Sequence, residues 1–242
     1  MDSTPTRIAP LTVTGIVFRE RKKPGDFKWM VSQPAYDKCA FVIMENYIDM
    51  VREDSGPGGG TAALRPYTMY HQADGKALRA MGVPTGWSSD ALGFRDLDRD
   101  TKRLIDLSLQ RMVILLQTTL SNVTTLYFSC DDKDPAKIGT GIFSKTLHAD
   151  VVAYISKKLQ ELPAAVAAAT EMPSLANIRG NELKYLRTAL LVDAAAERRA
   201  KRKREATADG GKELAAKPAG KQMRLTGMVS MRHCATLGAT RD

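Results

Sequence analysis

The sequence predicts an α/β domain over residues 8–162, in which a layered mixed sheet is flanked by helices. Short β-branched and apolar runs of strand length alternate with longer segments of helical spacing. The run at 39–44 is apolar throughout, which is typical of a strand buried on both faces. The chain has 242 residues, 43% of them hydrophobic, so it is long enough to bury a substantial core.

The first part of the chain contains three expected strands. They lie at 11–18, 27–32 and 39–44, and a charged turn with a Pro24-Gly25 break separates the first two. The third strand ends at two polar residues, Glu45 and Asn46. A loop with glycines at 56–60 follows, and then a helical segment at 61–65 that we expect to stop at Pro66. Residues 66–97 show no clear period, so we expect short elements there at most.

The second part contains the expected helices. The first begins at an Asp98 or Asp100 cap and runs to about Leu120, because its apolar residues recur at helical spacing on a broad face. A strand at 124–129 and a helix at 149–162 follow. Pro163 then begins an Ala-rich linker that extends to 178. A basic helix at 179–205 and a disordered tail at 206–242 complete the expected order.

The net charge of +9 lies almost entirely in the C-terminal part. Residues 1–178 hold 21 Lys+Arg and 20 Asp+Glu, net +1, whereas residues 179–242 hold 15 and 7, net +8. Six of the seven residues at 198–204 are basic. Such a run is typical of a nuclear-localisation signal or a nucleic-acid patch, and equally of a solvated basic helix end. It predicts a nucleic acid or an import receptor as the partner of residues 198–204.

We expect an intracellular protein, cytoplasmic or, in a eukaryote, nuclear. No apolar run reaches the length of a membrane span, and residues 1–10 lack the apolar core of a secretory signal, so we expect no membrane partner. The three cysteines are too few and too widely spaced for a disulfide framework or a zinc cluster. The acidic loop at 131–134 lacks the glycine and distal glutamate of a calcium loop. We therefore expect no metal and no cofactor.

Two glycine loops follow two of the expected strands. The first is Gly58, Gly59 and Gly60, and the second begins with Gly139, Thr140 and Gly141. Ligands in open α/β sheets bind beyond the carboxyl ends of the strands, where glycine backbone amides and helix N-termini approach anions. The loops therefore predict a site for the two phosphates of one diphosphate, with plain surface turns as the alternative. Neither loop fits a dinucleotide fingerprint or a P-loop.

Several side chains near these loops are candidates for chemistry. Arg65 could pair with a phosphate or be an ordinary surface arginine. Glu45 could be a general base with a raised pKa, or simply a polar strand end. His71 and Asp74 could form an acid–base pair, although a histidine in a loop is commonly incidental.

Residues 39–162 resemble a macro domain, the ADP-ribose-binding α/β fold. The matching features are a strand ending in Asn46, the loop at 58–60, the helix at 100–120, the strand at 126–129, the loop at 138–143 and the helix at 149–162. The most specific of them is Gly139-Thr140-Gly141-Ile142-Phe143. The resemblance implies that both glycine loops surround a diphosphate, that Asn46 faces the distal ribose and that Phe143 lines the sugar pocket.

Three functions are compatible with these patterns. The first is a macro-like domain that binds an ADP-ribose-type or nucleotide diphosphate ligand, with hydrolysis by Glu45 and Asn46 left open. The second is a nuclear or nucleic-acid-associated adaptor that acts through the basic tail. The third is an unrelated α/β enzyme with Glu45 or His71 as its base. We rank them in this order.

Overall fold

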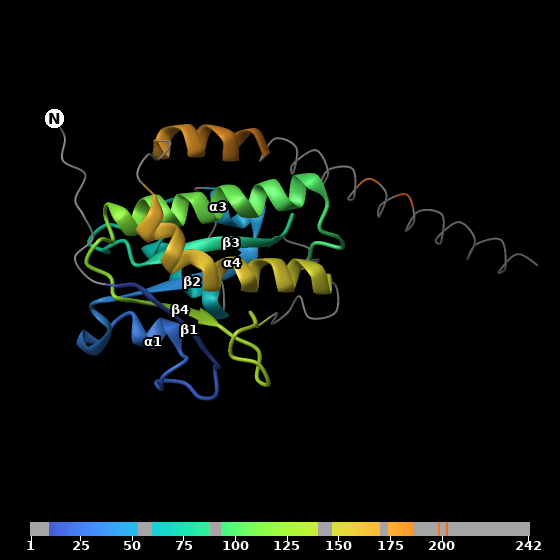
Figure 1. Cartoon of the computed structure of the whole chain (residues 1–242). Coiled ribbons are helices and arrows are strands. Elements are labelled where there is room, and N and C mark those ends of the chain that lie inside the picture. The colour runs from blue at the N-terminus through green and yellow to red at the C-terminus, as the bar shows by residue number, and fades with distance from the viewer. Residues whose placement is uncertain are drawn as a thin grey trace, which may run out of the picture. The chain divides into compact units, whose positions relative to one another are not determined.

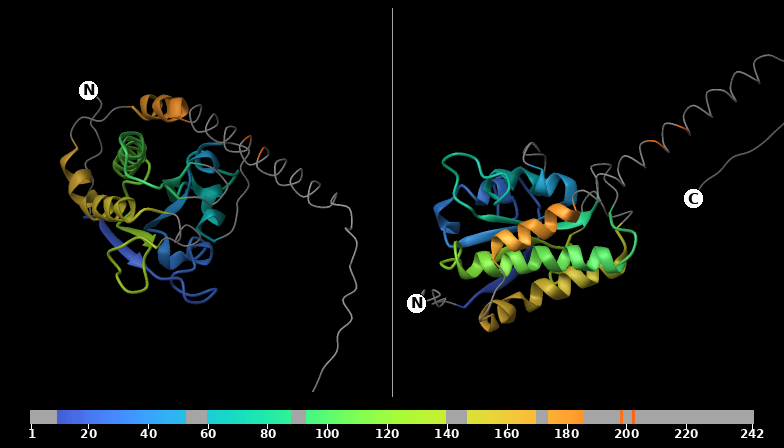
Figure 2. Two further views of the ribbon diagram at one scale, coloured as in Figure 1. Left: turned by 90° about the vertical axis from the view of Figure 1, so that its right-hand side faces the viewer. Right: turned by 90° about the horizontal axis from the view of Figure 1, so that it is seen from above.

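The computed structural model describes residues 10–52, 60–87, 93–139, 147–169 and 174–185, together with Arg198 and Arg202. The chain divides into two compact units, Met1–Glu197 and Arg198–Asp242. The first unit is an α/β domain, shown in Figures 1 and 2. The α/β class predicted from the sequence is therefore confirmed. The tail expected at 206–242 lies outside the described residues.

The sheet has four strands in the order β1-β4-β2-β3. They are β1 (Thr12–Ile16), β2 (Cys39–Asn46), β3 (Ala80–Gly86) and β4 (Thr125–Ser129). Every pair of these neighbours is parallel. The described strands thus form a parallel sheet and not the mixed sheet that we expected. Because β2 and β4 are neighbours in the middle of this sheet, their carboxyl ends lie side by side.

Residues 27–32, expected to be a return strand, begin instead with the short helix α1 (Phe27–Met30). The Asp26 side chain caps this helix by accepting a hydrogen bond from the Trp29 N–H at 3.3 Å. Phe27 and Met30 are both buried, which is the i, i+3 spacing of one helical face. The strand that we expected at 27–32 is therefore wrong. A short 3-10 helix, η1 (Pro34–Tyr36), follows.

Strand β3 lies within 66–97, where we expected short elements at most and assigned no strand. All seven of its residues are buried, but Gly82, Pro84 and Gly86 hide the apolar pattern. Proline lacks a backbone N–H and is tolerated in edge strands, and β3 pairs only with β2 among the described strands. Burial in the tertiary structure thus overrides the poor β-propensity of this segment.

The helices cover the two faces of the sheet. α3 (Arg99–Gln117) and α4 (Ala149–Ala168) pack side by side on one face, while α1 and the 3-10 helix η2 (Gly60–Tyr67) lie on the other, as the views in Figures 1 and 2 show. The cap of α3 is Asp98, whose side chain accepts from the Thr101 N–H at 2.7 Å. Pro66 lies inside η2 and does not stop it as expected.

Helix α4 continues through Pro163, where the sequence predicted the start of a linker. Proline removes one helical hydrogen bond, but Leu162 and Val166 on either side of it are buried in the core. The Gln117 side chain also donates to the carbonyls of Val166 and Ala169, at 2.9 and 2.8 Å. Tertiary contacts therefore hold the final turns that the local sequence disfavours.

A further helix occupies residues 175–185, so helical structure begins before residue 179, where we expected it. Two of its side chains, Ile178 and Glu182, are buried. Residues 186–197, most of the basic run and the remaining tail are outside the described residues. Among the helices that are described, none has both the length and the apolar character needed to cross a membrane.

Candidate functional site

The carboxyl end of β2 presents a buried acid. Side chains alternate along a strand, so Glu45 points to the same face as Phe41 and Ile43, toward η2. The next residue, Asn46, ends the strand and caps the short helix α2 (Tyr47–Val51), since its Oδ1 accepts from the Asp49 N–H at 2.8 Å. Its Nδ2 donates to Asp49 Oδ2 at 2.7 Å. The cap thus fixes the position of the Asp49 carboxylate beside Glu45.

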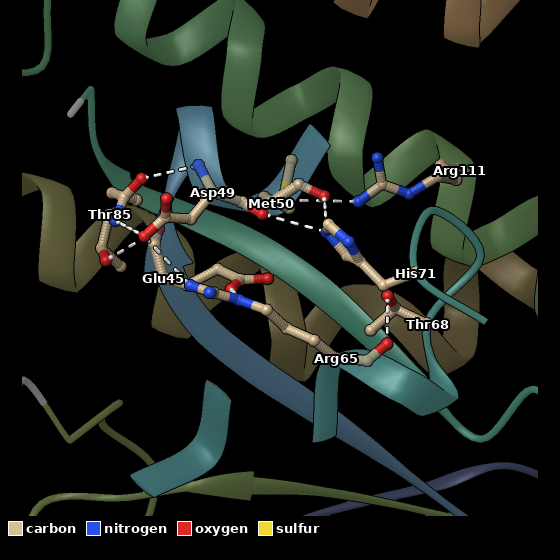
Figure 3. A network of polar contacts seen from close by, with 9 residues as sticks. Glu45, Asp49, Met50, Arg65, Thr68, His71, Thr85 and Arg111 are labelled. Carbon is tan, nitrogen blue, oxygen red and sulfur yellow. Dashed lines mark hydrogen bonds and ion pairs between the residues drawn. The ribbon is translucent and has the colours of Figure 1, made fainter. Parts of the chain in front are cut away.

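Arg65 in η2 joins these two acids. Its Nε donates to Glu45 Oε2 at 2.6 Å, and its Nη2 donates to Asp49 Oδ2 at 3.2 Å (Figure 3). The Arg65 side chain is 9% exposed, the Asp49 side chain 27% and the Glu45 side chain 3%. Glu45, Asn46 and Arg65, all singled out from the sequence, therefore meet at one point. The guanidinium that we expected to face a phosphate contacts two carboxylates of the protein in this structure.

Glu45 is in an electrostatically unfavourable position. Burial raises its pKa to about 7, against the lowering effect of Arg65, while Asp49 raises it further and Arg111 lowers it. Its Oε1 atom is buried and has no hydrogen-bond partner among the described residues, although a carboxylate oxygen normally has at least one. Within the described part of the chain, the Glu45 side chain is thus held through Oε2 only. Nearby, the Thr85 hydroxyl donates to the Glu45 backbone carbonyl at 3.3 Å.

His71 does not form the acid–base pair expected with Asp74. Its Nε2 lies 3.0 Å from the backbone carbonyls of both Asp49 and Met50, so Nε2 carries the hydrogen and donates to α2 (Figure 3). Asp74 is exposed. His71 Nδ1 is buried and has no hydrogen-bond partner within the described ranges. The described contacts therefore give His71 a role in holding α2.

The carboxyl end of β4 leads to the second glycine loop. The chain leaves β4 at Cys130, turns, and returns so that Ile138 forms an antiparallel bridge with Cys130. Gly139 then donates from its N–H to the Ser129 carbonyl at 2.7 Å. A Cβ atom at Gly139 would lie 2.7 Å from the Cys130 carbonyl oxygen, so only glycine fits this approach. Gly139 therefore lies at the carboxyl end of β4, and β4 is the neighbour of β2, which ends at Glu45 and Asn46.

The remaining predicted ligand residues cannot be placed. Gly60 begins η2. The others lie outside the described residues: Gly58, Gly59, Thr140, Gly141, Ile142 and Phe143. A diphosphate site formed by both loops consequently stays a prediction.

A second polar centre was missed by the sequence interpretation. Arg111 of α3 is 2% exposed and forms an ion pair through Nη1 with Glu182, which is fully buried. Its Nη2 donates to the Gly82 carbonyl at 2.8 Å. The Tyr70 hydroxyl donates to Glu182 Oε2, and the Tyr47 hydroxyl donates to the Glu182 backbone carbonyl. We call this group, Arg111, Glu182, Tyr70 and Tyr47, the Arg111 cluster.

The electrostatics of the Arg111 cluster are balanced. Burial by itself would lower the pKa of Arg111, but Glu182 and Tyr70 more than offset this, and the pKa is raised. Burial and the Glu182 charge raise the pKa of Tyr47 far above its ordinary value, so its hydroxyl remains a donor. The cluster attaches the helix at 175–185 to α3 and β3. The sequence interpretation missed Arg111 and Asp49, although each had a signal in the sequence. Arg111 interrupts the apolar face of α3, and Asp49 stands three residues after Asn46, the cap of α2.

Comparisons with protein-family models, with curated proteins and with solved structures gave no match for this chain.

Proposed function

We propose that the α/β domain is a macro-like module that binds an ADP-ribose-type or other nucleotide diphosphate ligand at the carboxyl edge of its sheet. The observation that carries the proposal is the pairing of β2 with β4. Each of these parallel strands is followed in the sequence by a glycine loop, the first after the short helix α2 and the second within ten residues of the strand end. The carboxyl ends of the two strands lie at the same edge of the sheet. One diphosphate could then contact both loops.

The side chains at this edge support an anion ligand. Arg65 follows the first loop by five residues and has its guanidinium at the end of β2. Gly139, at the end of β4, is the first residue of the second loop. Its own N–H donates to the Ser129 carbonyl at 2.7 Å, so a phosphate would take its amide donors from the residues that follow Gly139 in the loop. Guanidinium groups and backbone amides are the usual phosphate donors in proteins. The ligand would gain charge-assisted hydrogen bonds from Arg65 without a general positive field, because residues 1–178 are net +1.

Calorimetry of the full chain with ADP-ribose, NAD, ADP and inorganic pyrophosphate tests this proposal. We expect ADP-ribose to bind, and Gly141→Glu to abolish binding because it adds a bulky negative charge to the second loop. Gly180→Glu is the matched control, since Gly180 is exposed in the helix at 175–185 and has open space around it. Absence of heat with all four ligands, or unchanged affinity in Gly141→Glu, would exclude the proposal.

Hydrolysis of the ligand is tested in the same samples by analysing the products after incubation. Glu45 and Asn46 are the residues that would carry it, and both stand at the strand end. Glu45 is 3% exposed and its Oε2 is held by Arg65, so it could act as a base only after Arg65 releases it. Product formed by the wild type and lost in Glu45→Gln would make the domain a hydrolase. Binding without product would make it a binding module.

A second candidate function is nucleic-acid binding or nuclear targeting through the basic tail. The observation that favours it is the position of the basic run, because the second compact unit begins at Arg198. Residues 198–242 hold 12 Lys+Arg and 4 Asp+Glu, net +8. In the run itself the structure describes Arg198 and Arg202, which are helical and exposed.

The tail is best tested in the full chain with the six basic residues of 198–204 changed to glutamine. Removal of everything beyond 178 would also remove Glu182 and leave Arg111 buried without its countercharge. If all six contact phosphates, the slope of log affinity against log salt should fall by about five. Changing Lys212, Lys217 and Lys221 to glutamine is the control. An unchanged slope would exclude the run as the nucleic-acid contact.

A further inference from the structure

Among the described residues, the charges around Glu45 do not balance. Two acids, Glu45 and Asp49, share the guanidinium of Arg65, and each accepts one of its N–H donors. Three charged groups face Glu45 from the elements packed against β2: Arg65 from η2, Asp49 from α2 and Arg111 from α3. Of these, Arg111 already has Glu182 as its ion-pair partner. The uncharged neighbours are Thr85 and Gly82 of β3.

An anion that pairs with Arg65 would worsen this imbalance. A phosphate that pairs bidentately with the Nε–Nη2 edge of Arg65 takes the N–H donors that Glu45 and Asp49 now accept from. Asp49 can lose its partner at small cost, because its side chain is 27% exposed and water can replace the lost hydrogen bond. Glu45 cannot, because it is 3% exposed and its second oxygen already lacks a partner. A buried carboxylate without a countercharge is strongly unfavourable, and the group neutralises instead.

We propose that the ligand phosphate takes the Arg65 guanidinium from Glu45 and that Glu45 binds one proton from the solvent in the same step. This inference rests on the proposed function, because it needs a diphosphate that contacts Arg65. The neutral acid then keeps one O–H donor and loses the charge that burial disfavours. Ligand affinity is thereby linked to pH through a residue that the ligand need not touch.

The linkage predicts the direction of the pH effect. Burial raises the pKa of Glu45 to about 7, so the carboxyl is largely ionised above this pH in the free protein. If it is protonated in the complex, binding takes up nearly one proton there, and affinity falls about tenfold for each pH unit. Below this pH the free protein already carries the proton, and affinity becomes independent of pH. ADP-ribose is the suitable probe, because its diphosphate diester lacks the second phosphate ionisation near pH 6.

The test is calorimetry of the full chain with ADP-ribose, about one pH unit above the Glu45 pKa, in two buffers of different ionisation enthalpy. We expect the observed enthalpies to differ by nearly one buffer proton. In Glu45→Gln the difference should vanish and the affinity should be flat with pH. In Asp49→Asn, which removes the charge of the more exposed acid, the proton uptake should persist. Glu161→Gln, which changes an exposed acid in α4, is the control and should resemble the wild type.

Infrared difference spectra of the wild type provide a second measurement that needs no variant. Binding of ADP-ribose should add a protonated-carboxyl band and remove a carboxylate band. Binding with no buffer dependence and no new band would overturn the proton coupling while leaving the proposed function intact. Absence of ADP-ribose binding at every pH would overturn the proposed function, and the coupling with it.

Discussion

Two buried carboxylate–guanidinium pairs lie close together in this domain and differ in how completely they are satisfied. In the Arg111 cluster, one arginine faces one glutamate, and tyrosine hydroxyls and the Gly82 carbonyl supply further hydrogen bonds. At the end of β2, one arginine faces two acids, and Glu45 Oε1 has no hydrogen-bond partner in the part of the chain that the structure describes. Both pairs come from the same residue types, so their difference lies in their surroundings.

The difference separates a structural pair from a candidate functional one. A fully hydrogen-bonded buried pair fixes elements relative to one another, and removal of one partner is strongly destabilising. An incompletely satisfied acid with a pKa shifted toward neutrality is typical of sites that bind or transfer charge. We therefore assign the Arg111 cluster to attachment of the helix at 175–185, and the Glu45–Arg65 pair is the candidate for the ligand binding that we propose.

Removal of Glu182 should give the largest effect on stability. Glu182→Ala leaves Arg111 buried with no countercharge, and we expect a loss of about 3–5 kcal/mol in the free energy of unfolding. Urea denaturation monitored by circular dichroism measures it. The control is Glu161→Ala, an exposed acid paired with Lys157 and Lys158, for which we expect a change below about 1 kcal/mol. Equal losses in the two variants would refute the structural role of the cluster.

Glu45 should make stability depend on pH. Its pKa is about 7 when folded and near 4.5 when unfolded, so the folded protein binds the extra proton between these values. Stability should therefore fall as pH rises through this window, by about 3 kcal/mol in total from this group. Urea denaturation at a series of pH values measures the fall.

The matched variant is Glu45→Gln, in which this contribution should disappear because glutamine does not titrate. A pH profile identical to that of the wild type would show that Glu45 is ionised normally, and would remove the contrast between the two pairs.

Gly82 lies between the two pairs and tests whether they are separate. A Cβ atom there would come within 2.7 Å of the Met50 side chain and 3.2 Å of Glu45 Oε1, while the Gly82 carbonyl accepts from Arg111. Gly82→Ala should therefore destabilise the domain by about 1–3 kcal/mol through overpacking. Thermal unfolding measures this. An unchanged melting temperature would mean that the Met50 side chain moves away without cost and that it is not tightly packed against β3.

Gly180→Ala should give the smallest effect and the opposite sign. Gly180 is within the helix at 175–185, and a Cβ atom would meet nothing within 4 Å. Alanine favours a helix over glycine by up to about 1 kcal/mol, so the variant should be slightly more stable. The same thermal unfolding experiment measures it. Destabilisation would indicate that this helix face is more closely packed than the structure describes.

Much of the fold could be predicted from local sequence. The apolar run of β2, the β-branched β1 and β4, and the helical spacing of α3 each identified an element, because one periodicity was dominant in each. The segments that were missed, α1 and β3, show no dominant periodicity. In β3 two glycines and a proline interrupt the apolar pattern, and only burial against β2 makes the segment a strand. The end of α4 was missed for the same reason, since Gln117 and the core support helix beyond Pro163.

The candidate site was predicted in part. The sequence identified Glu45 and Asn46 as candidates because they are polar residues at the end of a buried strand. It identified Arg65 because this residue follows a glycine loop. Their mutual contacts could not be predicted, since twenty residues separate Glu45 from Arg65 and no periodicity connects them. The role of Asp49 depends on the α2 cap, which was not expected. The Arg111 cluster joins residues up to 135 positions apart, a pairing that local patterns do not encode.

The sequence by itself determined the α/β class, the order of most elements, the location of the net charge beyond residue 178 and the identity of the acid at the end of β2. These features follow from composition and short-range spacing. The tertiary structure alone decided the strand order, which makes β2 and β4 neighbours, and the partner of each buried charge. Charges are paired by distance in space and by the loss of water around them. The same residue types therefore became a satisfied pair at Arg111 and an unsatisfied one at Glu45.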